Sequence, residues 1–229
     1  MSASRSPNEE GKMRSRVYVW ELAVRLAHWT IVASMIVLGV TGFYIGFPFI
    51  SAPGEAYYNY VMGTMRFAHF AASFFLAVAF ILRVYWFIVG NEYSRFSGLF
   101  PVSKDQLRGM WSQFLYYTFI SNKRPHYVGH NPIAGLAYLG IYFLIFLQGL
   151  TGLALYAESH PGGLWWVLFS WLFAIAPNNV LRLVHHLLMW VFLAFFMLHL
   201  YLGSLNDILE RSGILSSMVT GYKSFEEEH

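Results

Sequence analysis

Four long apolar stretches alternate with polar connections along the chain. They run from about Leu22 to Ile45, Tyr60 to Val89, Ile133 to Tyr156 and Leu183 to Leu205. Each is long enough for a membrane-spanning helix, which needs about 20 mainly apolar residues. The pattern therefore predicts an all-α membrane protein, a bundle of four transmembrane helices built as a single domain over residues 1–229.

A fifth apolar run, Leu164 to Ala176, is short for a membrane span. Its tryptophans suit the boundary between lipid and water, where the amphipathic indole ring is enriched. We therefore expect a short helix that lies on the membrane surface before the last span. A fifth span would instead move the basic C-terminal tail to the opposite side of the membrane.

Basic residues lie on one side of this arrangement. The connections at 47–59 and 157–181 contain no Lys or Arg. The polar tail 1–16, the connection between the second and third spans and the tail 210–229 carry Arg5, Lys12, Arg14, Arg16, Arg95, Lys104, Arg108, Lys123, Arg124, Arg211 and Lys223. Because Lys and Arg are enriched in cytoplasmic loops, both termini are predicted to be cytoplasmic. The polar N-terminal tail also indicates no cleavable signal peptide.

Composition agrees with a membrane protein and narrows its chemistry. Charged residues make up 12% of the chain, against about 25% in an average soluble domain. There is no cysteine, which excludes disulfides, cysteine-ligated iron–sulfur clusters and the covalent attachment of c-type haem. Any metal or haem must therefore be held by His, Met or carboxylate side chains.

The main candidates for a site are the histidines inside the predicted spans: His28, His69, His185 or its neighbour His186, and His199. Ionisable residues within a membrane are costly and usually functional. His185 and His199 are 14 residues apart, which brings their rings to within about 40° of each other after a rise of about 21 Å. From His186 the angle is about 140°, so the spacing selects His185.

Matching depths pair these histidines. His28 and His199 each lie about two turns from the cytoplasmic ends of their helices. His69 and His185 lie near the outer ends of theirs. Each pair can fill both axial positions of a haem iron, and such a haem transfers electrons without binding a substrate. A single intramembrane His is often only a hydrogen-bond partner, but four at paired depths favour two haems.

An arginine lies three residues before each of three histidines, at Arg25, Arg66 and Arg182. This spacing places the arginine on the same helix face, one turn nearer the adjacent membrane surface. Guanidinium binds carboxylates well, so these arginines are candidate partners of haem propionates. The alternative is that they extend to the lipid headgroups.

The remaining histidines are less informative. His126 and His130 lie in the cytoplasmic loop, where Gly129 and Pro132 argue against the helix that a metal site of this spacing would need. His130 is expected to cap the third span or to border a quinone pocket. His160 and His229 have no evident partner.

Several segments resemble one known family. R-L-A-H-W at 25–29, M-R-F-A-H-F at 65–70 and H-x-L-L-M-W with H-L-Y at 185–201 look like the b-type cytochrome subunit of membrane-bound uptake nickel–iron hydrogenases. The loop motifs V-G-N-E-Y-S-R and G-H-N-P-I-A-G and the C-terminal M-V-x-G-Y-K-S are similar too. The resemblance covers nearly the whole chain after the first 15 residues.

The resemblance implies a role in respiration. Members of this family anchor the small and large hydrogenase subunits on the periplasmic face of the bacterial inner membrane. They pass electrons from H2 oxidation through two b haems to a quinone. Carried over by motif, the ligands are His28, His69, His185 and His199, and His186 departs from the family pattern.

Two other functions stay open. The haems could serve a different donor, such as a formate dehydrogenase, whose cytochrome subunit shares this plan, or a thiosulfate-type reductase. The chain could also be a membrane anchor or assembly subunit without redox work. A transporter is disfavoured, because no acidic residue lies at the middle of a span and no inverted repeat of broken helices is evident.

Overall fold

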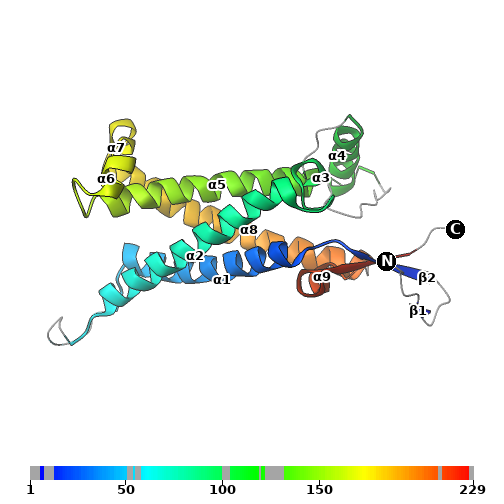
Figure 1. Cartoon of the computed structure of the whole chain (residues 1–229), viewed down its shortest axis with the longest axis horizontal. Coiled ribbons are helices and arrows are strands. Elements are labelled where there is room, and N and C mark those ends of the chain that lie inside the picture. The colour runs from blue at the N-terminus through cyan, green and yellow to red at the C-terminus, as the bar shows by residue number, and fades with distance from the viewer. Residues whose placement is uncertain are drawn as a thin grey trace. The chain divides into compact units, whose positions relative to one another are not determined.

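Four long helices dominate the structure, a computed structural model that describes residues 6–7, 13–50, 54, 58–99, 104–118, 120–121, 132–210 and 213–226. They are α1 (Leu22–Gly46), α2 (Val61–Val89), α5 (Pro132–Ala157) and α8 (Asn178–Glu210) (Figure 1). All four are long and apolar enough to cross a membrane. The four predicted spans are therefore confirmed, although the last helix begins earlier than its apolar stretch.

Five short helices complete the helical part of the described chain: α3 (Phe96–Leu99), α4 (Lys104–Tyr117), α6 (Leu164–Phe169), α7 (Leu172–Ile175) and α9 (Ile214–Thr220). The surface helix expected at 164–176 is divided into α6 and α7. Its residues Trp165 and Trp171 are exposed, as suits side chains at a lipid–water boundary.

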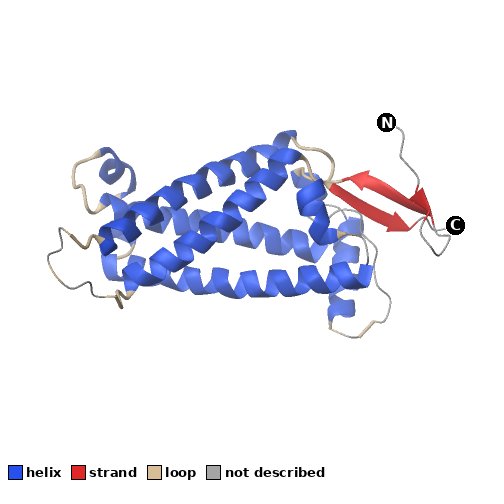
Figure 2. Ribbon diagram, turned by 90° about the horizontal axis from the view of Figure 1, so that it is seen from below, coloured by secondary structure: helices blue, strands red, loops and turns tan. Residues whose placement is uncertain are grey.

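The two tails pair in a small antiparallel sheet that the sequence did not predict. Its strands are β1 (Ser6–Pro7), β2 (Met13–Tyr18) and β3 (Tyr222–Glu226), in the order β1-β2-β3 (Figure 2). Tyr18 is paired with Tyr222 in the register of β2 and β3. The segments just before α1 and just after α9 therefore lie side by side.

The described residues form two compact units, and each is held together locally. The first comprises Met1–His28, Ile81–Leu139 and Leu198–His229. Val19, Trp20 and Val24 form its buried cluster. The Trp20 indole donates to the Ser217 hydroxyl over 3.1 Å, and the amide of Val19 donates to the Gly221 carbonyl over 2.8 Å.

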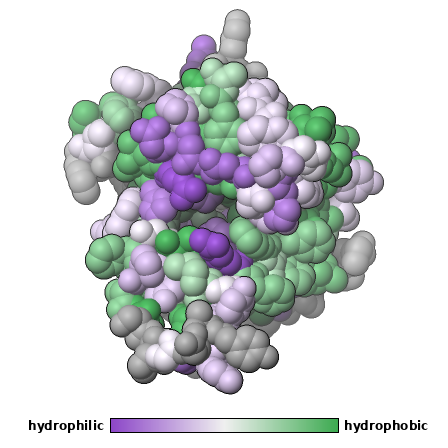
Figure 3. All heavy atoms as spheres, turned by 90° about the vertical axis from the view of Figure 1, so that its left-hand side faces the viewer, coloured by the Kyte–Doolittle hydropathy of each residue, from purple (hydrophilic) through white to green (hydrophobic). Residues whose placement is uncertain are grey.

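The second unit comprises Trp29–Phe80 and Gly140–Met197. Its buried positions include small residues such as Ala72, Ala79 and Ala154, which let helix backbones approach closely. Large apolar side chains point outward instead, as at Phe74 and Leu193, and this suits lipid. Figure 3 shows hydrophilic residues gathered within hydrophobic surroundings on the face at the α6–α7 end.

Candidate functional site

One pair of histidine rings lies in the second unit. His69, near the start of α2, and His185, near the start of α8, have ring centroids 6.4 Å apart and planes at 57°. Both side chains are half-buried. We call these two residues the outer pair, after their predicted side of the membrane.

A matching pair lies in the first unit. His28, in the second turn of α1, and His199, in the last third of α8, have ring centroids 6.3 Å apart and planes at 51°. His28 is half-buried and His199 is exposed. We call these two residues the inner pair. Both pairings predicted from the sequence are therefore brought together by the fold.

Both spacings fit two imidazoles that share one metal ion. A metal–nitrogen bond of about 2.0–2.1 Å and about 1.1 Å from the nitrogen to the ring centre give about 6.3 Å between two opposed rings. Among the described residues, no group of three or more His, Cys, Asp or Glu side chains gathers as a bare metal site would require. Two axial nitrogens per site suit haem, because the porphyrin supplies the other four.

A threonine fixes the ring of His69, the member of the outer pair on α2. The Thr41 hydroxyl donates to the Val37 carbonyl over 2.7 Å, and its oxygen lies 2.9 Å from His69 Nδ1. A hydroxyl has one hydrogen, so Nδ1–H of His69 is the donor in this second bond. The tautomer assigned in this way leaves the lone pair on Nε2, the atom that would face a haem iron.

The ring of His185, the member of the outer pair on α8, is held in the same way. The Thr151 hydroxyl lies 3.0 Å from the Leu147 carbonyl, to which it donates, and 2.9 Å from His185 Nδ1. Gln148 Nε2 lies 3.2 Å from His185 Nε2, which agrees with a lone pair on that atom. An iron ion bound there would replace Gln148 as its partner.

Glycines next to these threonines give the rings room. A Cβ atom on Gly42 would lie 3.3 Å from Cε1 of His69, and one on Gly152 would lie 3.1 Å from Cε1 of His185. Both distances are shorter than ordinary van der Waals contact. Each Thr-Gly pair therefore supplies a hydrogen-bond acceptor and the space for one imidazole.

His186 has a different environment from His185. Its Nδ1 lies 3.2 Å from the Arg182 carbonyl, and its ring lies against Gly46, where a Cβ atom would collide with Nε2. It is exposed, whereas His185 is half-buried and faces His69. This geometry agrees with the choice of His185 made from the helical spacing.

The three arginines predicted to meet propionates have different surroundings. Arg25 donates from Nη1 to the Val219 carbonyl. Arg66 is exposed. Arg182 lies 3.5 Å from the Glu158 carboxylate and donates to the Asn178 side chain over 2.6 Å. Arg182 therefore already has an acidic partner within the chain.

Sequence reasoning missed the groups that support the histidines. Threonines whose hydroxyl donates to a carbonyl of the preceding turn are common in membrane helices, so the sequence alone does not single out Thr41 and Thr151. Their hydrogen bonds to His69 and His185 show their role. Arg83 is 1% exposed within α2, and an arginine in an apolar helix is itself a signal of function.

His126, His130 and His229 lie outside the described residues, and His160 contacts Ser159 and Tyr156.

Comparison with known proteins places this geometry in a family. The model of prokaryotic cytochrome b561 matches residues 19–221. A protein of Azotobacter chroococcum named as a probable Ni/Fe-hydrogenase B-type cytochrome subunit is 40% identical over 96% of this chain and 93% of its own. The Escherichia coli K12 protein named as a probable Ni/Fe-hydrogenase 1 B-type cytochrome subunit is 36% identical over 90% of each chain.

The match covers all four long helices and both histidine pairs. Cytochromes of the b type hold haem without a covalent link to cysteine, in agreement with a chain that has none. The chain therefore belongs to the prokaryotic cytochrome b561 family and is a multi-pass membrane protein of electron transport.

Proposed function

We propose that the chain holds two b-type haems, one between His28 and His199 and one between His69 and His185. The observation that carries this proposal is the pair of ring spacings, 6.3 and 6.4 Å, because both would let two imidazoles hold one haem iron. A bound haem would supply one-electron exchange at iron. The protein supplies the ligands, their tautomers and an apolar setting.

The inner pair is assigned to the cytoplasmic side. The first unit, which contains it, also holds Arg16, Arg95 and Lys223 near the helix ends. The connections 47–59 and 157–181, which adjoin the outer pair, contain no Lys or Arg. The positive-inside rule then places both termini in the cytoplasm, and the pairing of β2 with β3 supports termini on the same side.

We further propose that electrons enter at the outer pair from a periplasmic nickel–iron hydrogenase and leave at the inner pair to a membrane quinone. This donor is supported by the relatives, which are named as probable Ni/Fe-hydrogenase cytochrome subunits. The chain would also anchor the hydrogenase small and large subunits to the inner membrane.

H2-dependent quinone reduction by membranes tests the proposal. Membranes from cells that make the hydrogenase are compared with and without this chain, and with the variant His199→Ala. Loss of quinone reduction in both, with H2 oxidation by an artificial dye retained, is the expected result. Unchanged quinone reduction without the chain, while the hydrogenase remains membrane-bound, would overturn the proposal.

Co-purification with the tagged chain distinguishes the alternative electron donors. Purification of the tagged chain in mild detergent should bring hydrogenase subunits with it. A formate dehydrogenase or a thiosulfate-type reductase in their place would keep the haem chemistry and change the donor. A haem-free chain that still binds a hydrogenase would indicate a membrane anchor.

A further inference from the structure

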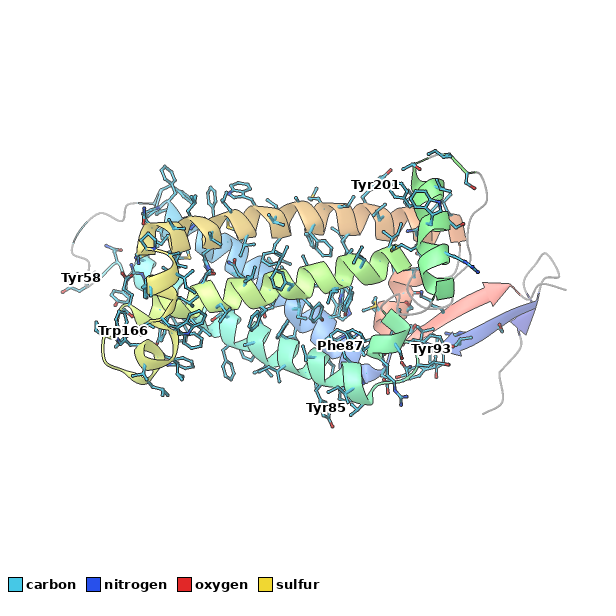
Figure 4. The ribbon with its side chains drawn as sticks, turned by 90° about the horizontal axis from the view of Figure 1, so that it is seen from above. Tyr58, Tyr85, Phe87, Tyr93, Trp166 and Tyr201 are labelled. Atoms are coloured by element: carbon cyan, nitrogen blue, oxygen red, sulfur yellow. The ribbon has the colours of Figure 1, made fainter. Side chains whose placement is uncertain are left out.

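Arg83 is a buried cation inside α2. Its side chain is 1% exposed. Nε donates to the Tyr138 hydroxyl over 3.0 Å, and Nη1 donates to the Ser94 carbonyl over 3.2 Å. The guanidinium carbon lies 4.4 Å from the ring centroid of Phe87, a residue labelled on this stretch of α2 in Figure 4.

Among the described residues, no adjacent carboxylate balances the positive charge of Arg83. Its hydrogen-bond partners are neutral, and within the described parts of the chain no carboxylate pairs with it and Nη2 has no hydrogen-bond partner. Arginine stays protonated in proteins. Burying such a charge is costly, so its place in an apolar helix calls for a function.

Hydrogen bonds of Glu21 show where Arg83 lies relative to the inner pair. Glu21, just before α1, accepts from the Trp86 indole over 3.0 Å and from the Asn91 amide over 2.8 Å. The start of α1 therefore lies beside the end of α2, and the helices run in opposite directions. All of these residues, with His28 and His199, belong to the first unit.

From this shared level, helical geometry places Arg83 near His28. His28 is seven residues beyond Glu21, which gives a rise of about 10 Å on nearly the same face of α1. Arg83 is three residues before Trp86, which gives about 4.5 Å within about 60° on α2. With about 8–10 Å between packed helices, the backbone of Arg83 lies roughly 10 Å from that of His28.

We propose that Arg83 is a fixed positive charge that raises the reduction potential of the haem held by His28 and His199. The inference rests on the two-haem function proposed above. Ferric haem with two neutral imidazoles carries one more positive charge than ferrous haem. A nearby cation therefore disfavours the ferric form and favours uptake of the electron, with no proton transferred.

This tuning suits the direction of transfer. An inside-negative membrane potential opposes movement of electrons from the outer to the inner surface. A higher potential at the inner haem offsets that opposition. Glu21 is the carboxylate beside this end of α2, but it is only half-buried whereas Arg83 is 1% exposed. Water therefore screens the charge of Glu21 more than that of Arg83.

A redox titration of the purified full-length cytochrome tests the inference. Arg83→Met removes the charge and puts an unbranched apolar side chain in its place, whereas Arg83→Lys keeps the charge. At about 10 Å and an effective dielectric constant of about 20, one charge changes the reduction equilibrium on the order of tenfold, or about 59 mV for one electron. We expect that lowering for the inner haem in Arg83→Met and most of the wild-type potential in Arg83→Lys.

The control variant is Arg95→Met. Arg95 is exposed and donates to the Gly90 carbonyl, so water screens its charge and its removal should leave both potentials near the wild-type values. The outer haem serves as an internal control in every sample. The inner haem is identified as the component lost in His199→Ala.

A second variant covers the case in which Arg83→Met does not fold. Ser94→Asp keeps Arg83 and adds a carboxylate to the residue whose backbone carbonyl accepts from the guanidinium, so the inner potential should again fall. Two haems with an unchanged inner potential in the folded variants would overturn the inference and leave the proposed function intact. A wild-type chain without two haems would instead overturn the proposed function.

Discussion

Replacement of Thr151 by valine probes the support of the outer haem. The substitution keeps the shape of the side chain and removes its hydroxyl oxygen, which lies 2.9 Å from His185 Nδ1. Thr151 is 6% exposed, so water cannot easily replace the lost acceptor. Nδ1–H is then left without its partner.

The magnitude follows from two sources. An unsatisfied buried donor costs about 1–3 kcal/mol. Loss of a hydrogen-bond partner of a metal-ligating histidine typically lowers metal affinity by about 10–100-fold. We therefore expect the outer haem of Thr151→Val to dissociate about 10–100-fold more readily, while the inner haem, held by residues of the other unit, stays bound.

The assay is transfer of haem to an excess of a haem-scavenging apoprotein, followed by absorbance. Thr64→Val is the matched control, because its hydroxyl donates to the Tyr60 carbonyl in the same way and Thr64 is exposed. Thr151→Ser retains the acceptor and should restore slow release. Wild-type release from a folded Thr151→Val would refute the role of this hydrogen bond.

Three further predictions concern neighbouring features. Gly152→Ala should weaken outer-haem binding, because the new Cβ atom would lie 3.1 Å from the His185 ring, whereas Gly149→Ala meets nothing within 4 Å and should retain both haems by pyridine haemochrome assay. His186→Ala should keep two haems, and loss of the outer one would assign the ligand to His186. Trp20→Phe removes a buried 3.1 Å hydrogen bond to Ser217, so thermal unfolding should show a loss of about 1 kcal/mol; unchanged stability would contradict that estimate.

The four spans could be predicted from the sequence because hydropathy and length decide them. The choice of His185 over His186 could also be made from the sequence, because helical spacing determines which residue lies on the same helix face as His199. The sheet was not predicted. Its strands are short, and they pair residues near opposite ends of the chain, so no local sequence pattern predicts them.

The support around the ligands needed three-dimensional information. The Thr-Gly pairs at 41–42 and 151–152 are visible in the sequence, but nothing local says that each meets a histidine on another helix. Arg83 did carry a signal, since it follows His69 by the same 14 residues that separate His185 and His199. What the spacing could not show is that its hydrogen-bond partners are neutral.

The central claim is that four named histidines bind two haems. Reduced-minus-oxidised spectra with haem quantitation, on the wild type and on alanine variants of the two pairs, test it most directly. We predict about two b haems per chain, with one spectral component lost in His69→Ala and His185→Ala and the other lost in His28→Ala and His199→Ala. One haem per chain, or losses that do not follow these pairs, would contradict the account.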